Sequence, residues 1–171
     1  MDGHDMNLVI IRGIPGSGKS TFANLVAQAL EPHAKSDSCI CTTDDYDGLY
    51  SYPGDGEVVF HGGEKIDGGL PMIVLAHQWN QGRARDAMEH GVSVVVPNTN
   101  CQRWEFQPYL DMADEFGYRV TVVSLFDGGL TDDELFYRNA HGVPVDGIAR
   151  MRQGYEHDWA NADARPPWER E

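Results

Sequence analysis

One stretch near the N-terminus constrains the fold more than any other, because three different patterns follow one another there without a break. Residues 8–11 are a short, β-branched apolar run with no polar alternation, which is typical of a strand covered on both faces. Residues 13–20 then fit the pattern G-x-x-x-x-G-K-[ST]. From Thr21 onward apolar residues recur at helical spacing. Strand, glycine turn and helix in this order predict a phosphate-binding loop.

The residue types in this turn suit the binding of a triphosphate. Backbone N–H groups reach phosphate oxygens only where side chains do not intrude, and the unpaired N–H groups and positive dipole of the following helix add to the attraction. Lys19 is expected to bridge the β- and γ-phosphates of ATP, and the Ser20 hydroxyl to complete the coordination of Mg²⁺. The candidate nucleotide-binding residues of the loop are Gly13, Pro15, Gly16, Ser17, Gly18, Lys19, Ser20 and Thr21.

The rest of the chain alternates predicted strands with predicted helices. Further strands are expected at 38–42, 92–96 and 118–125, and further helices at 71–90, 104–116, 131–138 and 145–156. Thr131 is expected to cap its helix with Glu134 as capping-box partner. Helical crossovers favour an α/β fold with a parallel sheet of four to five strands flanked by helices, as in P-loop NTPases. We expect one domain over 1–160, a helical lid at about 131–156 and a flexible tail over 161–171.

The segment over 48–69 does not fit this alternation. It is rich in Gly, Asp, Tyr and Pro and has little periodicity, so it reads as a long excursion that includes at most a small hairpin. Connections of this length are usually functional or mobile. A second lid and an acceptor groove are the two roles that we consider for it.

Composition bounds the compartment and the partners. Cys39, Cys41 and Cys101 cannot all pair and are predicted to be packed free thiols, with Cys39 and Cys41 on one face of a strand. No apolar run of eighteen residues is present, and the N-terminus is acidic. We therefore expect neither a membrane span nor a signal peptide. We expect a cytoplasmic location.

A formal net charge of −14 disfavours nonspecific contact with nucleic acid. Any such contact must depend on a local basic patch. Because only three lysines occur in the chain, arginines have to supply that patch.

Polar residues follow two of the predicted strands, at the edge of a parallel sheet where ligands bind. Asp44 and Asp45 are candidates for the group that takes a proton from an acceptor hydroxyl, and residues 98–100 follow the next strand. The alternative for either aspartate is a solvated turn that caps a helix. The pattern does not choose between the two carboxylates.

Three arginines lie in the predicted lid, where they could stabilise a moving phosphoryl group. They are Arg138, Arg150 and Arg152. The alternative is that they form surface ion pairs with the many carboxylates. His77, on a predicted helix, and His141, in the turn before Pro144, are interpreted as structural residues.

Five motifs together resemble the P-loop polynucleotide 5′-hydroxyl kinase family, which includes the kinase domain of the phage end-healing enzyme and its eukaryotic and phage-encoded relatives. They are Gly-Ile-Pro-Gly-Ser-Gly-Lys-Ser-Thr (13–21), Thr-Asp-Asp-Tyr (43–46), Ala-His-Gln-Trp-Asn-Gln-Gly-Arg-Ala (76–84), Asn-Thr-Asn (98–100) and Arg-Asn-Ala-His-Gly-Val (138–143). The resemblance implies transfer of the γ-phosphate of ATP to a 5′-hydroxyl of DNA or RNA. It assigns Asp44 as general base, Thr99 as an acceptor contact and Arg138 as the phosphate-clamping arginine.

The predicted site follows from the phosphate-binding loop and from this resemblance. Lys19, Asp44 and Arg138 are predicted to be catalytic, and Arg138 also to bind the nucleotide. Asp45, Thr99, Asn100 and Arg150 are predicted to contact the acceptor.

The sequence departs from the family at two positions. Asp47 stands where the phage enzyme has an arginine that touches the acceptor phosphate, and Pro97-Asn98 supply no acid before Thr99. The acceptor is therefore either a nucleic-acid end or a small molecule, nucleoside or modified base with a hydroxyl. A non-catalytic nucleotide-binding module is the third reading.

Overall fold

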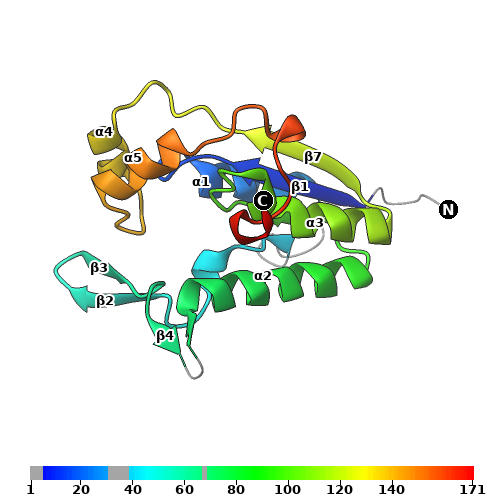
Figure 1. Ribbon diagram of the computed structural model, residues 1–171, viewed down its shortest axis with the longest axis horizontal. Helices are drawn as coiled ribbons and strands as arrows, with labels where there is room; N and C mark the ends of the chain where they lie inside the picture. The colour runs from blue at the N-terminus through cyan, green and yellow to red at the C-terminus, as the bar shows by residue number, and fades with distance from the viewer. Residues whose placement is uncertain (1–5, 31–38, 67–68) are drawn as a thin grey trace.

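A computed structural model describes residues 6–30, 39–66 and 69–171 of the chain. Its centre is a parallel sheet with the strand order β6-β1-β7, made of β1 (Asn7–Arg12), β6 (Val94–Val96) and β7 (Arg119–Ser124) (Figure 1). The predicted α/β fold with a parallel sheet is confirmed, but the sheet has three strands among the described residues and not the four to five expected. The strand expected at 38–42 is reduced to one parallel bridge between Ile40 and Val95, and Ser38 lies outside the described residues.

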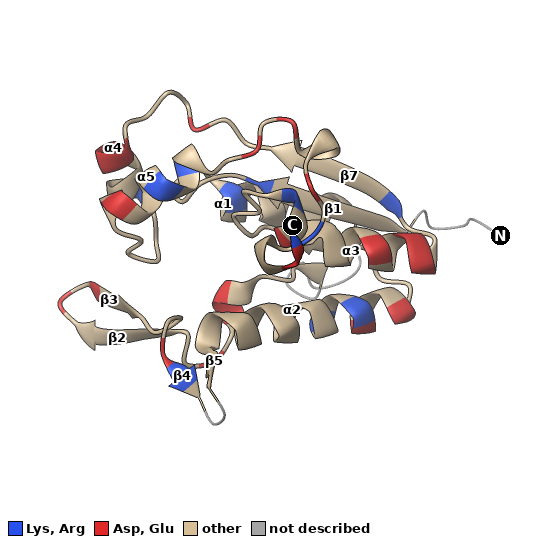
Figure 2. Ribbon diagram, in the orientation of Figure 1, with Lys and Arg blue, Asp and Glu red and all other residues tan. Residues whose placement is uncertain are grey.

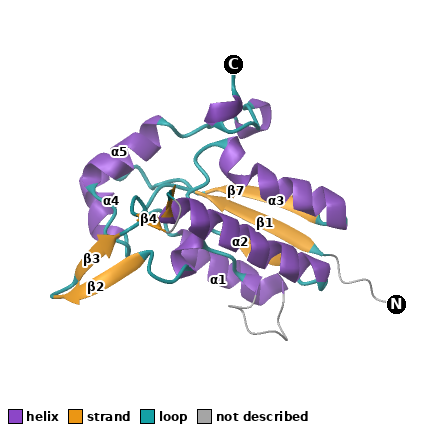
Figure 3. Ribbon diagram, turned by 60° about the horizontal axis from the view of Figure 1, so that its bottom comes forward, coloured by secondary structure: helices purple, strands orange, loops and turns teal. Residues whose placement is uncertain are grey.

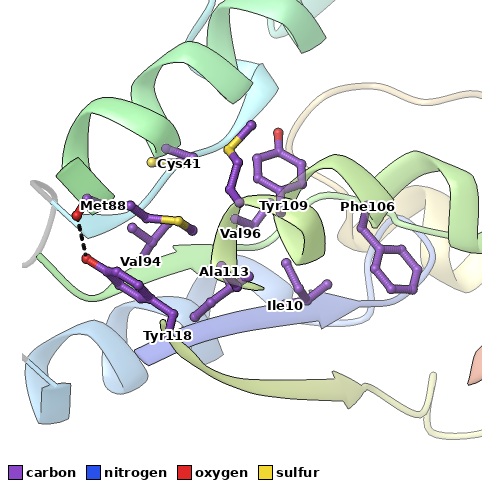
Figure 4. Close-up of a cluster of buried hydrophobic side chains, with 12 residues drawn as sticks. Ile10, Cys41, Met88, Val94, Val96, Phe106, Tyr109, Ala113 and Tyr118 are labelled. Carbon is purple, nitrogen blue, oxygen red and sulfur yellow. Dashed lines mark hydrogen bonds between the residues drawn. The ribbon is translucent and has the colours of Figure 1, made fainter. Parts of the chain in front are cut away.

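Helices cover both faces of the sheet because the side chains of β1 alternate between them. Leu8 and Ile10 point into the core beneath α2 (Met72–Glu89) and α3 (Arg103–Phe116) (Figure 4). Val9 and Ile11 pack on the opposite face against α1 (Lys19–Leu30). Two buried faces explain why this strand has no polar alternation.

All three cysteines are free and buried, as predicted. The expectation that Cys39 and Cys41 share one face is wrong, because Cys39 packs with α1 and Cys41 with α2 and α3. The backbone at Cys39 is not in strand conformation, so the period of two does not apply across this pair.

The predicted lid forms as two short helices, α4 (Asp132–Arg138) and α5 (Val145–Gln153). Thr131 and Glu134 make the expected capping box. The last helix ends three residues before the predicted boundary at residue 156, because Gly154 follows Gln153 as the C-cap.

The excursion over 48–69 contains two small antiparallel pairs. The first is a hairpin of β2 (Tyr50–Gly54) and β3 (Glu57–Phe60), and the second pairs β4 (Lys65–Ile66) with β5 (Leu70–Pro71). The hairpin and the α4–α5 pair lie at the same end of the sheet, away from the N-terminus (Figure 3). Segments that are about 80 residues apart in the chain therefore meet at one end of the molecule.

The tail follows a defined path over α3. It includes two single turns of 3₁₀ helix, η3 (Trp159–Asn161) and η4 (Pro167–Glu169). Trp168 meets Trp104 edge to face with ring centroids 5.4 Å apart, which is a favourable aromatic geometry. Flexibility of residues 161–171 stays a prediction.

Candidate active site

The loop between β1 and α1 has the geometry expected of a phosphate cradle. Lys19 is the first residue of α1, and its Nζ donates to the Ile14 carbonyl at 3.1 Å across the turn. The next two residues, Ser20 and Thr21, are exposed at the start of the helix. A hydroxyl and free helix N–H groups are thus presented at the end of the sheet where ligands bind.

The α4–α5 pair, which is the predicted lid, packs directly on this loop. Gly16 has a φ of +80°, and a Cβ at this position would lie 2.6 Å from the Leu135 carbonyl oxygen of α4. Ile14 of the loop forms a buried cluster with Leu135 of α4 and Ile148 of α5. The glycine is therefore required twice, by its backbone conformation and by the close approach of the lid.

The segment after β6 is fastened to the start of the loop through its backbone. The N–H of Gly13 donates to the Thr99 carbonyl at 3.0 Å. Asn100 is buried, and its Nδ2 donates to the Ile11 carbonyl at 3.2 Å. The Asn100 side chain is thus occupied by the protein, and its predicted contact with the acceptor stays a prediction.

Arg12 is a buried structural residue beside the site that the sequence analysis did not identify. It is wholly buried at the end of β1 and donates to the carbonyls of Asn100, Cys101 and Glu156, each at 2.8 Å. Burial lowers the pKa of its guanidinium, and the three carbonyls with the Tyr155 ring at 4.6 Å compensate for the buried charge. A lone arginine that ends an apolar strand beside the loop motif was the available signal.

Asp44 lies beside the loop in the single 3₁₀ turn η2 (Thr43–Asp45). Asn98 holds this turn in place, since its Oδ1 accepts from both the N–H and the hydroxyl of Thr43, at 3.1 and 3.2 Å. The carboxylate of Asp44 raises the pKa of Lys19 through its charge, while the larger effect of burial lowers it, to a net value of about 8. The predicted base and the predicted phosphate lysine are thus close enough to interact.

The carboxylate of Asp44 has two further neighbours. The Tyr50 hydroxyl donates to Oδ1 at 3.0 Å, and Nε2 of His141 lies 3.2 Å from Oδ2. His77 of α2 is half-buried, and burial lowers its pKa while the charge of Asp44 raises it. His141 lies in a turn, as predicted, and this turn also brings its ring onto the predicted base.

The remaining predicted residues have different surroundings. The carboxylate of Asp45 forms an ion pair with Arg83 of α2 at 2.9 Å, and Arg150 forms one with Asp146 at 3.0 Å, where both side chains are largely exposed. Arg138, at the end of α4, is exposed, and no hydrogen bond or ion pair joins it to another described residue. It is free to reach a phosphate.

Arg152 is committed to structure rather than to a ligand. It pairs with Asp127 and Asp132 and donates to the Leu130 carbonyl at 2.9 Å. These contacts tie α5 to the segment before α4, so the surface-pair alternative holds for this arginine.

A cavity of about 270 Å³ borders this site under α5. Two of the predicted acceptor contacts, Thr99 and Arg150, line it. Other lining residues include Cys101, Gln102, Glu105 and Gly154. Burial raises the pKa of Glu105 to about 7. Lys19 lies within range of the electrostatic influence of Cys101, so the cavity adjoins the phosphate lysine.

Within residues 6–30, 39–66 and 69–171, no group of three or more His, Cys, Asp or Glu side chains is arranged to hold a metal ion. Among the helices that the structure describes, none is both long and apolar enough to span a bilayer.

Comparison with known proteins agrees with this geometry. The family described as an AAA domain (AAA_33) matches residues 8–140. The human protein NEDD4-binding protein 2 is 36% identical over 155 residues, which cover 87% of this chain. The match spans 8% of the length of that relative.

Proposed function

Because this chain belongs to the AAA_33 family of AAA domains, a P-loop NTPase-like family, we propose that it is an ATP-dependent kinase. In this proposal the γ-phosphate of ATP passes to a 5′-hydroxyl end of DNA or RNA. The observation that carries the proposal is the position of Asp44, which is close enough to Lys19 to affect its pKa. A base beside the phosphate lysine is what transfer to a hydroxyl requires, whereas nucleotide binding alone does not need it.

The proposed roles follow from the surroundings of each residue. The loop amides and Lys19 bind the β- and γ-phosphates, and Mg²⁺ is held by the Ser20 hydroxyl together with the phosphates. The exposed Ser20 side chain at the helix start suits this role. Bound Mg²⁺ would neutralise charge on the phosphates, and Arg138, which is exposed at the end of α4, would clamp the moving phosphoryl group.

The transfer step is then simple to state. The acceptor hydroxyl gives its proton to the Asp44 carboxylate as its oxygen bonds to the γ-phosphorus. The bond from that phosphorus to the β–γ bridging oxygen breaks, and ADP leaves. The cavity at Thr99 and Arg150 is the proposed place for the rest of the acceptor, since it adjoins Lys19.

The charge at this end of the molecule is mixed, so binding of an anionic ligand depends on Lys19 and Arg138 and not on a broad basic surface. Basic residues lie at the start of α1 and on α5, while acidic residues mark α4 and the ends of α2 and α3 (Figure 2). The net charge of −14 makes the remainder of the surface unfavourable for a long polyanion. We therefore propose contact with the terminal nucleotides only.

A small hydroxyl acceptor is the second candidate. Asp47, where the phage enzyme has an arginine, is exposed, and the cavity is partly acidic through Glu105. Both features suit a neutral acceptor better than a phosphate-bearing one.

One assay separates the candidates. The protein is incubated with γ-labelled ATP and Mg²⁺ against 5′-hydroxyl DNA, 5′-hydroxyl RNA, nucleosides and small alcohols, with Lys19→Met as the inactive control. Label on an oligonucleotide end supports the first candidate, and label on small acceptors alone supports the second. ATP hydrolysis or binding with no labelled acceptor would contradict the kinase proposal.

A further inference from the structure

The surroundings of Asp44 contain more than a base requires. Three segments meet there: the turn η2, the hairpin strand β2 that follows it closely in the chain, and the distant loop between α4 and α5. Tyr50 donates to one carboxylate oxygen at 3.0 Å and His141 approaches the other at 3.2 Å. The two rings also stack on each other, with centroids 5.0 Å apart and planes 30° apart.

We propose that Tyr50 and His141 hold the Asp44 carboxylate in a fixed orientation, so that His141 is a positioning residue through which the lid controls the base. This inference rests on the proposed kinase function. We refer to Tyr50, Asp44 and His141 as the carboxylate clamp. Residues that orient a catalytic carboxylate matter because a misplacement of about 1 Å can cost about 100-fold in rate.

Hydrogen bonding decides which partner donates. Burial and the adjacent Asp44 carboxylate raise the pKa of Tyr50, so its phenol keeps the proton and donates. Nδ1 of His141 is buried with no hydrogen-bond partner in the described structure. A ring with its one hydrogen on Nε2 leaves only a lone pair unsatisfied there, whereas a doubly protonated ring would bury an unpaired N–H group.

The clamp leaves the base able to work. An ionised carboxylate has about four lone-pair positions, and these two donors use one on each oxygen. A free lone pair remains to accept the proton of the acceptor hydroxyl. His141 and Tyr50 keep their own protons throughout, so the step changes the protonation of Asp44 alone.

The lid loop is shaped to deliver His141. Asn139 closes the loop on itself, since its Oδ1 accepts from the Val143 N–H at 2.8 Å and its Nδ2 donates to the Phe136 carbonyl at 2.7 Å. Gly142 has a φ of +63°, and a Cβ there would lie 3.1 Å from the Cβ of Val58 in β3. The loop therefore rests on the hairpin, and movement of the lid away from the hairpin would remove His141 from the base.

The kinetic test compares three substitutions. His141→Ala and Tyr50→Phe are each expected to lower kcat about 10- to 100-fold with the KM for ATP changed less than about twofold. His141→Gln, which offers an amide N–H in place of the ring N–H, is expected to recover part of the loss. His157→Ala changes an exposed histidine outside the site and is the matched control.

A second measurement does not depend on activity. Nitrogen-15 NMR of the histidine rings is expected to show His141 with its hydrogen on Nε2. Asp44→Ala is expected to change the chemical shift of that nitrogen. A ring with its hydrogen on Nδ1, or one unaffected by Asp44→Ala, would overturn the clamp. An unchanged kcat in His141→Ala, or a loss confined to the KM for ATP, would overturn the positioning role. If the unmodified protein labels no acceptor, the proposed function fails, and the NMR result still decides on the clamp.

Discussion

The phosphate loop (residues 13–20) and the carboxylate clamp lie next to each other but are built in different ways. The loop is continuous in sequence and works largely through its backbone, with glycines where the lid and the turn demand them. The clamp is made only of side chains, and they come from η2, β2 and the α4–α5 loop. Substitutions in the loop should therefore act on nucleotide binding and stability, whereas substitutions in the clamp should act on transfer.

The strongest test of this division is Asp44→Asn. The amide has nearly the same shape but cannot take up a proton at neutral pH, so we expect kcat to fall about 1000-fold, within the range for a lost general base. The Kd for ATP should stay within about threefold. Asp47→Asn is the matched control, because it makes the same chemical change at an exposed site three residues away. Near-normal turnover in Asp44→Asn would assign the base elsewhere.

Substitutions at two glycines test the role of the phosphate loop. Gly16→Ala and Gly18→Ala both place a side chain at positive φ, but only at Gly16 would the Cβ meet backbone, 2.6 Å from the Leu135 carbonyl oxygen. We expect a loss of about 1 kcal/mol for Gly18→Ala and about 2–3 kcal/mol for Gly16→Ala. Thermal unfolding should show a Tm lowered by about 3 °C and about 8 °C respectively. Equal losses would mean that the lid does not press on the loop.

Arg138 tests whether the lid serves the phosphate as well as the base. Its side chain is exposed, and no ion pair to another described residue would be lost on substitution. Arg138→Ala is therefore expected to lower kcat at least about tenfold while the Tm stays unchanged. Arg85→Ala, which removes an exposed arginine of α2 that pairs with Glu115 of α3, is the control. A normal rate in Arg138→Ala would make Arg138 an ordinary surface residue.

The contrast between loop and clamp also explains what could be predicted from the sequence. The strand, turn and helix around residues 13–20 depend on neighbours in the chain, so the sequence pattern predicts them. The capping box at Thr131 is predictable for the same reason. The meeting of Tyr50 with His141 depends on how a hairpin and a lid loop fold back over many residues. No spacing in the sequence encodes that contact. Gly142 and Asn139 shape the loop locally, but neither residue determines what the loop touches.

The part of the fold that was predicted wrongly has a related cause. The run over 38–42 has strand-like composition, yet its described part makes only one bridge, at Ile40. Composition predicts only a preference for strand conformation. The number of β-bridges also depends on the length of the neighbouring strand, and β6 has only three residues. In the same way, a buried arginine such as Arg12 is visible as a residue type, but the carbonyls that surround it come from two distant segments, at residues 100–101 and at Glu156.

Lys19 connects the two regions, and its titration offers the finest test of the comparison. With a pKa of about 8 in the free protein, compared with 10.5 for an ordinary lysine, about half of the molecules carry a neutral Lys19 at pH 8. Phosphate favours the charged form, so ATP binding at pH 8 should take up about half a proton, and binding should weaken as the pH rises above 8. Calorimetry in two buffers with different ionisation enthalpies measures this uptake.

Variants of Lys19 and Asp44 are expected to change this proton uptake in opposite directions. Lys19→Met should take up no proton, and at pH 6 the unmodified protein should take up none at this site because Lys19 is already charged. Asp44→Asn removes a charge that raises the pKa of Lys19, so more molecules start neutral and the uptake at pH 8 should rise above that of the unmodified protein. An uptake unchanged by Asp44→Asn would show that the loop and the clamp, although adjacent, do not interact electrostatically. Two physical links would then remain: the lid, through Leu135 on the loop and His141 on the base, and the segment after β6, which holds η2 through Asn98 and the loop through the Thr99 carbonyl.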